Sequence, residues 1–130
     1  MASKRIGLLA PVLLALLLLC GGGARAGMAV IVNPANQIDR LSKSQVINIF
    51  LANSREFPNS VAVSPIDLGA DSPENARFYR ALVNRGPEQM QAYWSRLVFS
   101  GKATPPAKAA SWQDVIQAVA ANPHAIGYVD

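Results

Sequence analysis

Hydrophobic and polar positions alternate along residues 28–130 in patterns typical of strands and helices. Residues 28–32, 61–66 and 125–129 are short apolar runs rich in β-branched side chains, which predict buried strands. The stretches between them place apolar residues three and four positions apart, as on the buried face of a helix. The order is strand, helix, strand, three helices, strand. Strands separated by helices predict an α/β sandwich with a largely parallel sheet.

Capping residues mark where these helices begin. A Ser that precedes a helix-like pattern is an expected N-cap, as at Ser42, Ser72 and Ser111. Pro73 and Pro87 stand at first helical positions, where a missing N–H is tolerated. Polar, Pro-containing residues 53–60 and 100–110 predict exposed loops, and Lys108 is expected on the surface of the second. Trp94 and Trp112 share helical spacing with aliphatic residues, which predicts core packing.

Residues 1–26 predict an export signal. Lys4 and Arg5 precede an apolar run from residue 6 to residue 19, and Ala24-Arg25-Ala26 forms a small-x-small cleavage site. The run of 14 residues is shorter than the roughly 20 that a membrane-spanning helix needs. We therefore expect cleavage and a periplasmic domain of residues 27–130, with a retained membrane anchor as the alternative.

Cys20 offers another alternative, because a thiol after an apolar run can be lipidated. Leu19 argues against a lipoprotein, since such a site favours a small residue before the Cys. Cys20 is the one cysteine in the chain, so cleavage after Ala26 leaves a domain without disulfide or thiolate chemistry.

The charge balance bears on the class of partner. The chain has 12 basic and 8 acidic residues, but Lys4, Arg5 and Arg25 belong to the leader, so residues 27–130 are almost neutral. Nucleic-acid binders usually carry a basic stripe on the folded part, so the composition argues against that class. About 100 residues suffice for one core and one domain.

Catalytic and metal-binding patterns are weak in this sequence. His124 is the one histidine and has no mature cysteine to pair with, so the chain offers no convincing nucleophile and base. His124 is expected to be a turn residue rather than a ligand. Acidic residues are dispersed except between Asp67 and Glu74, where a carboxylate pair is an open alternative to solvated acids. We therefore expect that the protein is not an enzyme and that it binds neither a metal nor a cofactor.

An oxyanion site is the clearest binding hypothesis from the residues. The strand at 61–66 leads through a short turn into the helix from Pro73, and a helix N-terminus presents unpaired N–H groups and a positive dipole end. Ser72 would donate its hydroxyl, beside the backbone N–H groups of Glu74 and Asn75.

Other residues of the same turn oppose that hypothesis. Ser72 is equally an ordinary N-cap, and Pro73 removes one backbone donor. Asp67 and Asp71 would repel an anion unless Arg77 offsets their charge.

Several segments together resemble a known family. They are Leu-Ser-Lys-x-Gln-Val-x-x-Ile-Phe-Leu at 41–51, the helix after Ser72 with Phe78 and Leu82, Tyr-Trp-Ser-Arg-Leu-Val-Phe-Ser-Gly at 93–101, and Asn-Pro-His-Ala-Ile-Gly-Tyr-Val at 122–129. The chain resembles the phosphate-binding subunit of ABC transporters, in the type II periplasmic-binding-protein superfamily, and in particular its short, single-lobe relatives. The resemblance spans nearly all of residues 28–129. It implies a three-layer-type α/β sandwich like one lobe of such a protein, and phosphate binding for transport or sensing.

Departures from the family pattern lie in the anion loop. The family has an Arg after the second strand and a Gly-Ser-Gly-Thr turn, whereas this chain has Asp67 near the Arg position and Asp-Ser-Pro-Glu at 71–74. Of the residues in the family's anion loop, only the Ser is present in this chain, as Ser72. The missing second lobe would also leave Tyr128 and Phe57 exposed as part of a cleft wall, which invites a partner.

Two functional hypotheses follow. In the first, the exported chain binds phosphate or a similar oxyanion as a transport or sensing accessory, through residues that share the turn or the cleft wall: Ser72, Glu74, Asn75, Arg77, Asp67 and Tyr128. In the second, the ligand site has decayed and the chain is a periplasmic interaction module that binds a periplasmic or membrane protein, or a second copy of itself.

Overall fold

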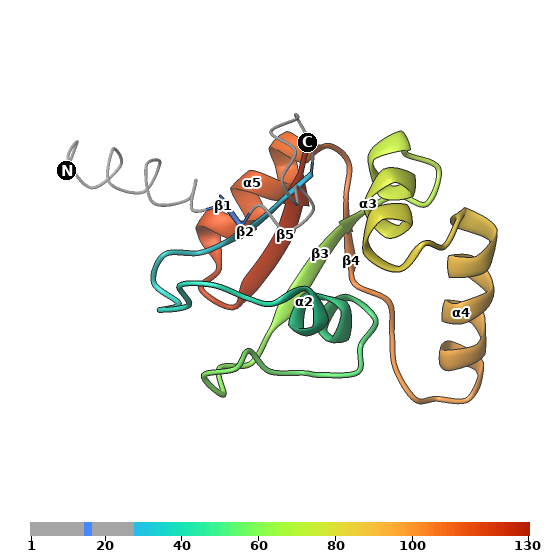
Figure 1. Ribbon diagram of the computed structural model, residues 1–130, viewed down its shortest axis with the longest axis horizontal. Coiled ribbons are helices and arrows are strands. Elements are labelled where there is room, and N and C mark those ends of the chain that lie inside the picture. The colour runs from blue at the N-terminus through green and yellow to red at the C-terminus, as the bar shows by residue number, and fades with distance from the viewer. Residues whose placement is uncertain (1–14, 17–27) are drawn as a thin grey trace.

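The computed structural model describes residues 15–16 and 28–130 (Figure 1). Its elements, in chain order, are β1 (Ala15–Leu16), β2 (Ala29–Val32), α2 (Lys43–Phe50), β3 (Ser64–Leu68), α3 (Pro73–Val83), α4 (Pro87–Phe99), β4 (Ala107–Ala109), α5 (Trp112–Ala121) and β5 (Ala125–Val129). The predicted cleavage site and Cys20 lie outside the described residues, as does the export signal apart from the two residues of β1.

The strands form one mixed sheet of order β1-β2-β5-β3-β4. β3 runs parallel to both β5 and β4, whereas β2 runs antiparallel to β5 and to β1. The α/β class is confirmed, but the sheet is mixed rather than largely parallel. Apolar runs predict that a strand is buried and carry no information on the direction in which its neighbours run.

Two strand predictions need correction. The second strand is Ser64–Leu68 rather than 61–66, so Asp67 belongs to the strand and not to the turn that follows. The segment 100–110 is not all loop, because Ala107–Ala109 pairs in parallel with residues 66–68. Small residues and a lysine carry no strand signal, so β4 depends on the edge that β3 offers it.

The helix starts are confirmed in detail. The three serine side chains each accept a hydrogen bond from the third residue of the helix, and they are Ser42, Ser72 and Ser111. α3 ends at Val83 because Asn84 takes a left-handed conformation with φ of 55°.

Helices lie on both faces of the sheet (Figure 1). Gly127 of β5 faces α5, since a Cβ there would lie 2.5 Å from Val115 Cγ1. Its neighbour Tyr128 faces the opposite side, where the ring stacks on Phe78 of α3 at 3.8 Å and meets Phe50 of α2 edge-on. Tyr128 and Phe57 are both buried, so the expectation that they form an exposed cleft wall is wrong.

α4 stands apart from this body, beyond α3 (Figure 1). Met90 is its one buried residue, and the Tyr93 hydroxyl donates to the Leu51 carbonyl at 2.6 Å. Val98 is 50% and Phe99 94% exposed at its C-terminal end. Trp112 is 38% exposed at the start of α5, so its predicted core packing is wrong. Among the described residues, no helix combines the length and apolarity needed to cross a membrane.

Candidate functional site

The buried carboxylate of Asp67 is the centre of a hydrogen-bond cluster near the carboxyl end of β3. Oδ1 accepts from the Leu68 backbone N–H at 2.7 Å, from Asn75 Nδ2 at 3.0 Å and from the Tyr128 hydroxyl. Oδ2 accepts from the Tyr79 hydroxyl at 2.7 Å. An ionised carboxylate has about four acceptor sites, so these donors use nearly all of its capacity. We call Asp67, Asn75, Tyr79 and Tyr128 the Asp67 cluster.

The local sequence explains how α3 supplies two of these donors. The Ser72 cap starts the helix so that Asn75 lies in its first turn, and Tyr79 follows four residues later on the same face. Asn75 Nδ2 also donates to the Leu68 carbonyl at 3.0 Å, which ties the start of α3 to the end of β3. Tyr128 belongs to β5, the strand that pairs with β3.

Electrostatics keep both tyrosines in their neutral form. Burial, and next the negative charge of Asp67, raise the pKa of Tyr79 well above its ordinary value. The same two causes raise the pKa of Tyr128. Both hydroxyls therefore stay protonated at neutral pH and remain donors to the carboxylate.

Lys108 places a cation next to this cluster. It pairs with Asp67 in the register of β3 and β4, so both side chains leave the same face of the sheet. Its Nζ lies 3.7 Å from Asp67 Oδ2, and the side chain is 45% exposed. That separation is an ion pair but is longer than a hydrogen bond.

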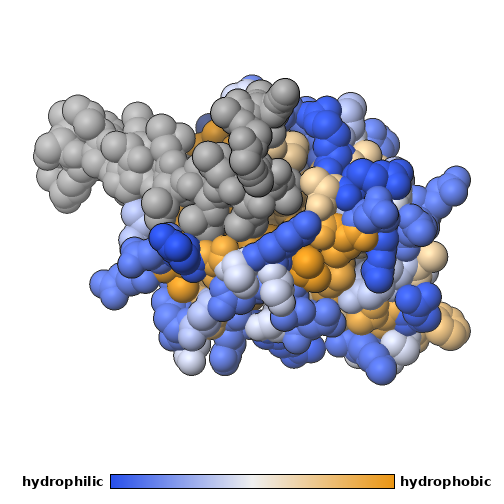
Figure 2. All heavy atoms as spheres, in the orientation of Figure 1, coloured by the Kyte–Doolittle hydropathy of each residue, from blue (hydrophilic) through white to orange (hydrophobic). Residues whose placement is uncertain are grey.

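A cavity of about 550 Å³ lies between this cluster and α4. Its lining combines polar groups and mostly apolar ones, namely Asp67, Ala70, Asn75, Tyr79, Pro87, Met90, Gln91, Trp94, Ser95, Val98, Phe99, Pro105 and Lys108. We call the apolar side formed by Met90, Trp94, Val98 and Phe99 the α4 wall. On the face turned to the viewer, Figure 2 shows hydrophobic surface between α2, α3 and α4, bordered by hydrophilic side chains.

A second cavity of about 710 Å³ adjoins the first. It lies between α2, the start of β3 and the loop at 101–107, and it shares Val98 and Pro105 with its neighbour. Both volumes fall in the roughly 300–1,000 Å³ range of small-molecule sites. The two cavities together leave room for a ligand that is longer than an inorganic anion.

The predicted site residues do not all meet. Asp67 and Asn75 line the first cavity, and Tyr128 lies directly behind them. Ser72, Glu74 and Arg77 are not part of that lining. The Ser72 hydroxyl oxygen accepts a hydrogen bond from the Asn75 backbone N–H at 2.9 Å, so that N–H is not free to bind an anion.

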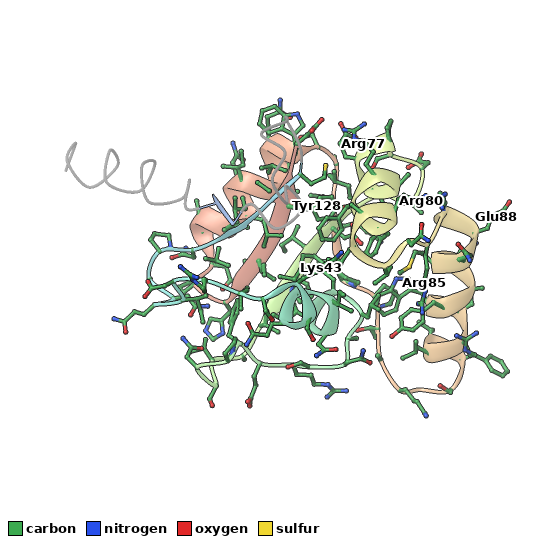
Figure 3. The ribbon with its side chains drawn as sticks, viewed as in Figure 1. Lys43, Arg77, Arg80, Arg85, Glu88 and Tyr128 are labelled. Carbon is green, nitrogen blue, oxygen red and sulfur yellow. The ribbon has the colours of Figure 1, made fainter. Side chains whose placement is uncertain are left out.

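Arg77 does not offset the charge of Asp67. Its guanidinium pairs with Asp130 at 2.6 Å, at the C-terminal end of the chain (Figure 3). The cation beside Asp67 is Lys108 instead.

Sequence reasoning missed Tyr79 and Lys108. Trp94 packs against the core as predicted, and it also lines the cavity. The spacing of Asn75 and Tyr79, four residues apart, was a usable signal for a shared helix face. Lys108 carried no such signal, because the strand that presents it was predicted to be loop.

Within the part of the chain that the structure describes, no three His, Cys, Asp or Glu side chains come together as a metal site would require. His124 follows Asn122 in a turn, and its Nδ1 lies 3.0 Å from the Ala62 carbonyl oxygen.

Comparison with known proteins identifies no relative of this chain. No protein-family model matches the chain, and neither a curated protein nor a solved structure is significantly similar to it.

Proposed function

We propose that this chain is an exported binding protein, with the fold of one periplasmic-binding-protein lobe, that takes an organic ligand with an apolar body into the cavity under α4. The observation that carries the proposal is the cavity of about 550 Å³ between the Asp67 cluster and the α4 wall. Such a cavity, apolar on one side and with a few convergent polar groups, is the usual form of a small-molecule site. Its position near the carboxyl end of β3 is also where α/β sheets usually bind ligands.

Oxyanion binding at the Ser72 turn has less support from this geometry. The Ser72 hydroxyl and the Asn75 N–H bond to each other, Pro73 has no N–H, and Asp67 places negative charge nearby. A transport or sensing role remains compatible with an organic ligand, since it depends on export and binding and not on the ligand's class.

The test uses the chain expressed with its own leader and recovered from the periplasm. Mass spectrometry shows whether residues 1–26 are removed, as an export signal requires. Fluorescence of Trp94, in a Trp112→Phe background, then reports titration with 1-octanol and with inorganic phosphate. We expect octanol to change the Trp94 emission saturably and phosphate to leave it unchanged.

A matched pair of substitutions locates the binding. Ser95→Phe fills the cavity and should abolish the octanol response, whereas Ala92→Phe lies on the exposed side of the same helix and should preserve it. A response to phosphate that Ser72→Ala removes would favour the oxyanion hypothesis instead.

A second candidate function is docking of a periplasmic or membrane protein, or of a second copy. Val98 and Phe99 favour it, because two neighbouring apolar side chains that are 50% and 94% exposed at the end of α4 form apolar surface that a partner could cover. Sedimentation velocity over a concentration series tests self-association. A dimer that Phe99→Ser dissociates would support this candidate, and a monomer at all concentrations would count against the second-copy form.

A further inference from the structure

We infer that the ligand of the cavity under α4 is a monoanionic amphiphile whose carboxylate head binds Lys108 and whose apolar chain lies along the α4 wall. The inference rests on the proposed function and specifies the chemical class of the ligand.

The choice of an anionic head follows from the difference between Asp67 and Lys108. Asp67 accepts four hydrogen bonds from the protein, so it has little capacity left for a donor on a ligand. Lys108 has three N–H donors, and its nearest acidic oxygen, at 3.7 Å, is too distant to take a hydrogen bond. The group with free hydrogen-bonding capacity at this site is therefore the exposed ammonium, and an acceptor on a ligand can replace the water to which it donates.

The position of Lys108 directs that acceptor into the cavity. Lys108 lines the cavity, is the one cation among the described residues that do so, and is 45% exposed. A ligand carboxylate that approaches from the cavity would place the ammonium between two carboxylates, one of them Asp67. Asp67 thus positions the ammonium without competing for its hydrogen bonds.

The charge of the site argues against more than one negative charge on the ligand. Asp67 and Lys108 bring one acidic and one basic group to the lining. A single ligand carboxylate can pair with the ammonium, but a second negative charge would face Asp67 without compensation. Inorganic phosphate, which is a mixture of monoanion and dianion at neutral pH and has no apolar body, fits this arrangement less well than a monocarboxylate.

The apolar remainder of the cavity indicates the other half of the ligand. Met90, Trp94, Val98 and Phe99 present aliphatic and aromatic surface within the same cavity as Lys108. A second cavity shares Val98 and Pro105 with this one. An unbranched hydrocarbon chain attached to the carboxylate is the simplest body that fits this extended apolar surface.

The experiment compares ligands that share one hydrocarbon chain. Octanoate, 1-octanol and octylammonium are titrated into the periplasmic protein, with Trp94 fluorescence in the Trp112→Phe background as the readout. We expect octanoate to bind about tenfold more tightly than octanol, because a hydrogen bond to a charged group adds roughly that much affinity. Octylammonium should bind more weakly than octanol.

Variants of Lys108 separate its charge from its packing. Lys108→Gln should reduce octanoate affinity to the level of octanol, and Lys108→Arg should retain most of the preference. Lys43→Gln is the matched control, since Lys43 is an exposed lysine at the start of α2 that lines neither cavity.

The outcomes distinguish this inference from the proposed function. Equal affinity for octanoate and octanol, or a preference for octanoate that Lys108→Gln leaves intact, would overturn the inference that Lys108 binds a ligand carboxylate. The proposal that the cavity binds an apolar ligand would not be affected. Tighter binding of octylammonium would assign the head-group site to Asp67 instead. Absence of binding for all three amphiphiles would overturn both proposals.

Discussion

The two sides of the cavity differ in how they are held in place. The Asp67 cluster is buried, and its carboxylate, hydroxyl and amide groups bond to one another across β3, α3 and β5. The α4 wall belongs to a helix with one buried residue and ends in the exposed ring of Phe99. The fold therefore depends on the Asp67 cluster but not on the exposed side chains at the end of the α4 wall. Substitutions in the Asp67 cluster should lower folding stability, whereas substitutions at the end of the α4 wall should affect binding with little effect on stability.

The largest effect is expected from Asp67→Ala. Removing the carboxylate leaves buried hydroxyl and amide donors without an acceptor, which should lower the free energy of unfolding by about 3–5 kcal/mol. Urea unfolding followed by circular dichroism measures the change. Asp71→Ala removes an exposed carboxylate four residues away and should stay within about 0.5 kcal/mol of the wild type. Equal effects of the two substitutions would contradict the conclusion that the fold depends on the buried Asp67 carboxylate.

Loss of a single donor to Asp67 should have an intermediate effect. Tyr79→Phe and Tyr128→Phe each remove one hydrogen bond to a charged acceptor, so each should lower the free energy of unfolding by about 1.5–3 kcal/mol. Tyr93→Phe removes a bond to the neutral Leu51 carbonyl and should cost about 1 kcal/mol. If Tyr93→Phe is the least stable of the three variants, the hydrogen bonds to the Asp67 carboxylate do not stabilise the fold more than a hydrogen bond to a neutral carbonyl does.

Alkaline pH should reveal the same buried tyrosines. In the unfolded chain they ionise with a pKa of about 10, whereas in the folded protein the pKa of both Tyr79 and Tyr128 is raised. The stability they contribute is therefore complete below about pH 10 and declines above it, by about 1.4 kcal/mol per pH unit for each tyrosine.

Denaturation midpoints between about pH 9 and 12 measure this decline. Comparison with Tyr128→Phe isolates one tyrosine from the other groups that titrate in the same range. The variant should lose stability less steeply with pH than the wild type, and parallel curves would show that Tyr128 ionises alike in both states.

The smallest effect on stability is expected at the end of the α4 wall. Phe99 is 94% exposed, so Phe99→Ser should change the free energy of unfolding by less than about 0.5 kcal/mol. Met90→Ala, on the buried side of the same helix, should cost about 2–5 kcal/mol. Thermal unfolding of the two variants compares them directly, and a large loss in Phe99→Ser would show that the ring packs against something in solution.

Local rules predicted much of the framework and part of the site. Helix starts at Ser42, Ser72 and Ser111 depend on side chains within three residues, so they were readable from the sequence. Asp67 and Asn75 were candidates because they flank one strand-to-helix turn. Ser72, in contrast, is occupied by its own cap, and Arg77 by Asp130, and neither pairing favours the predicted anion site.

The sequence by itself determined the α/β class, the helices with their caps, and the apolar strands at 28–32 and 125–129, because these follow from periodicity and contacts between near neighbours. Only the tertiary structure decided that β4 forms and that Tyr128 and Lys108 meet Asp67. Tyr128 lies 61 residues from Asp67 along the chain. Pairings over such distances depend on which strands become neighbours, and hydrophobic patterns leave the order and direction of strands open.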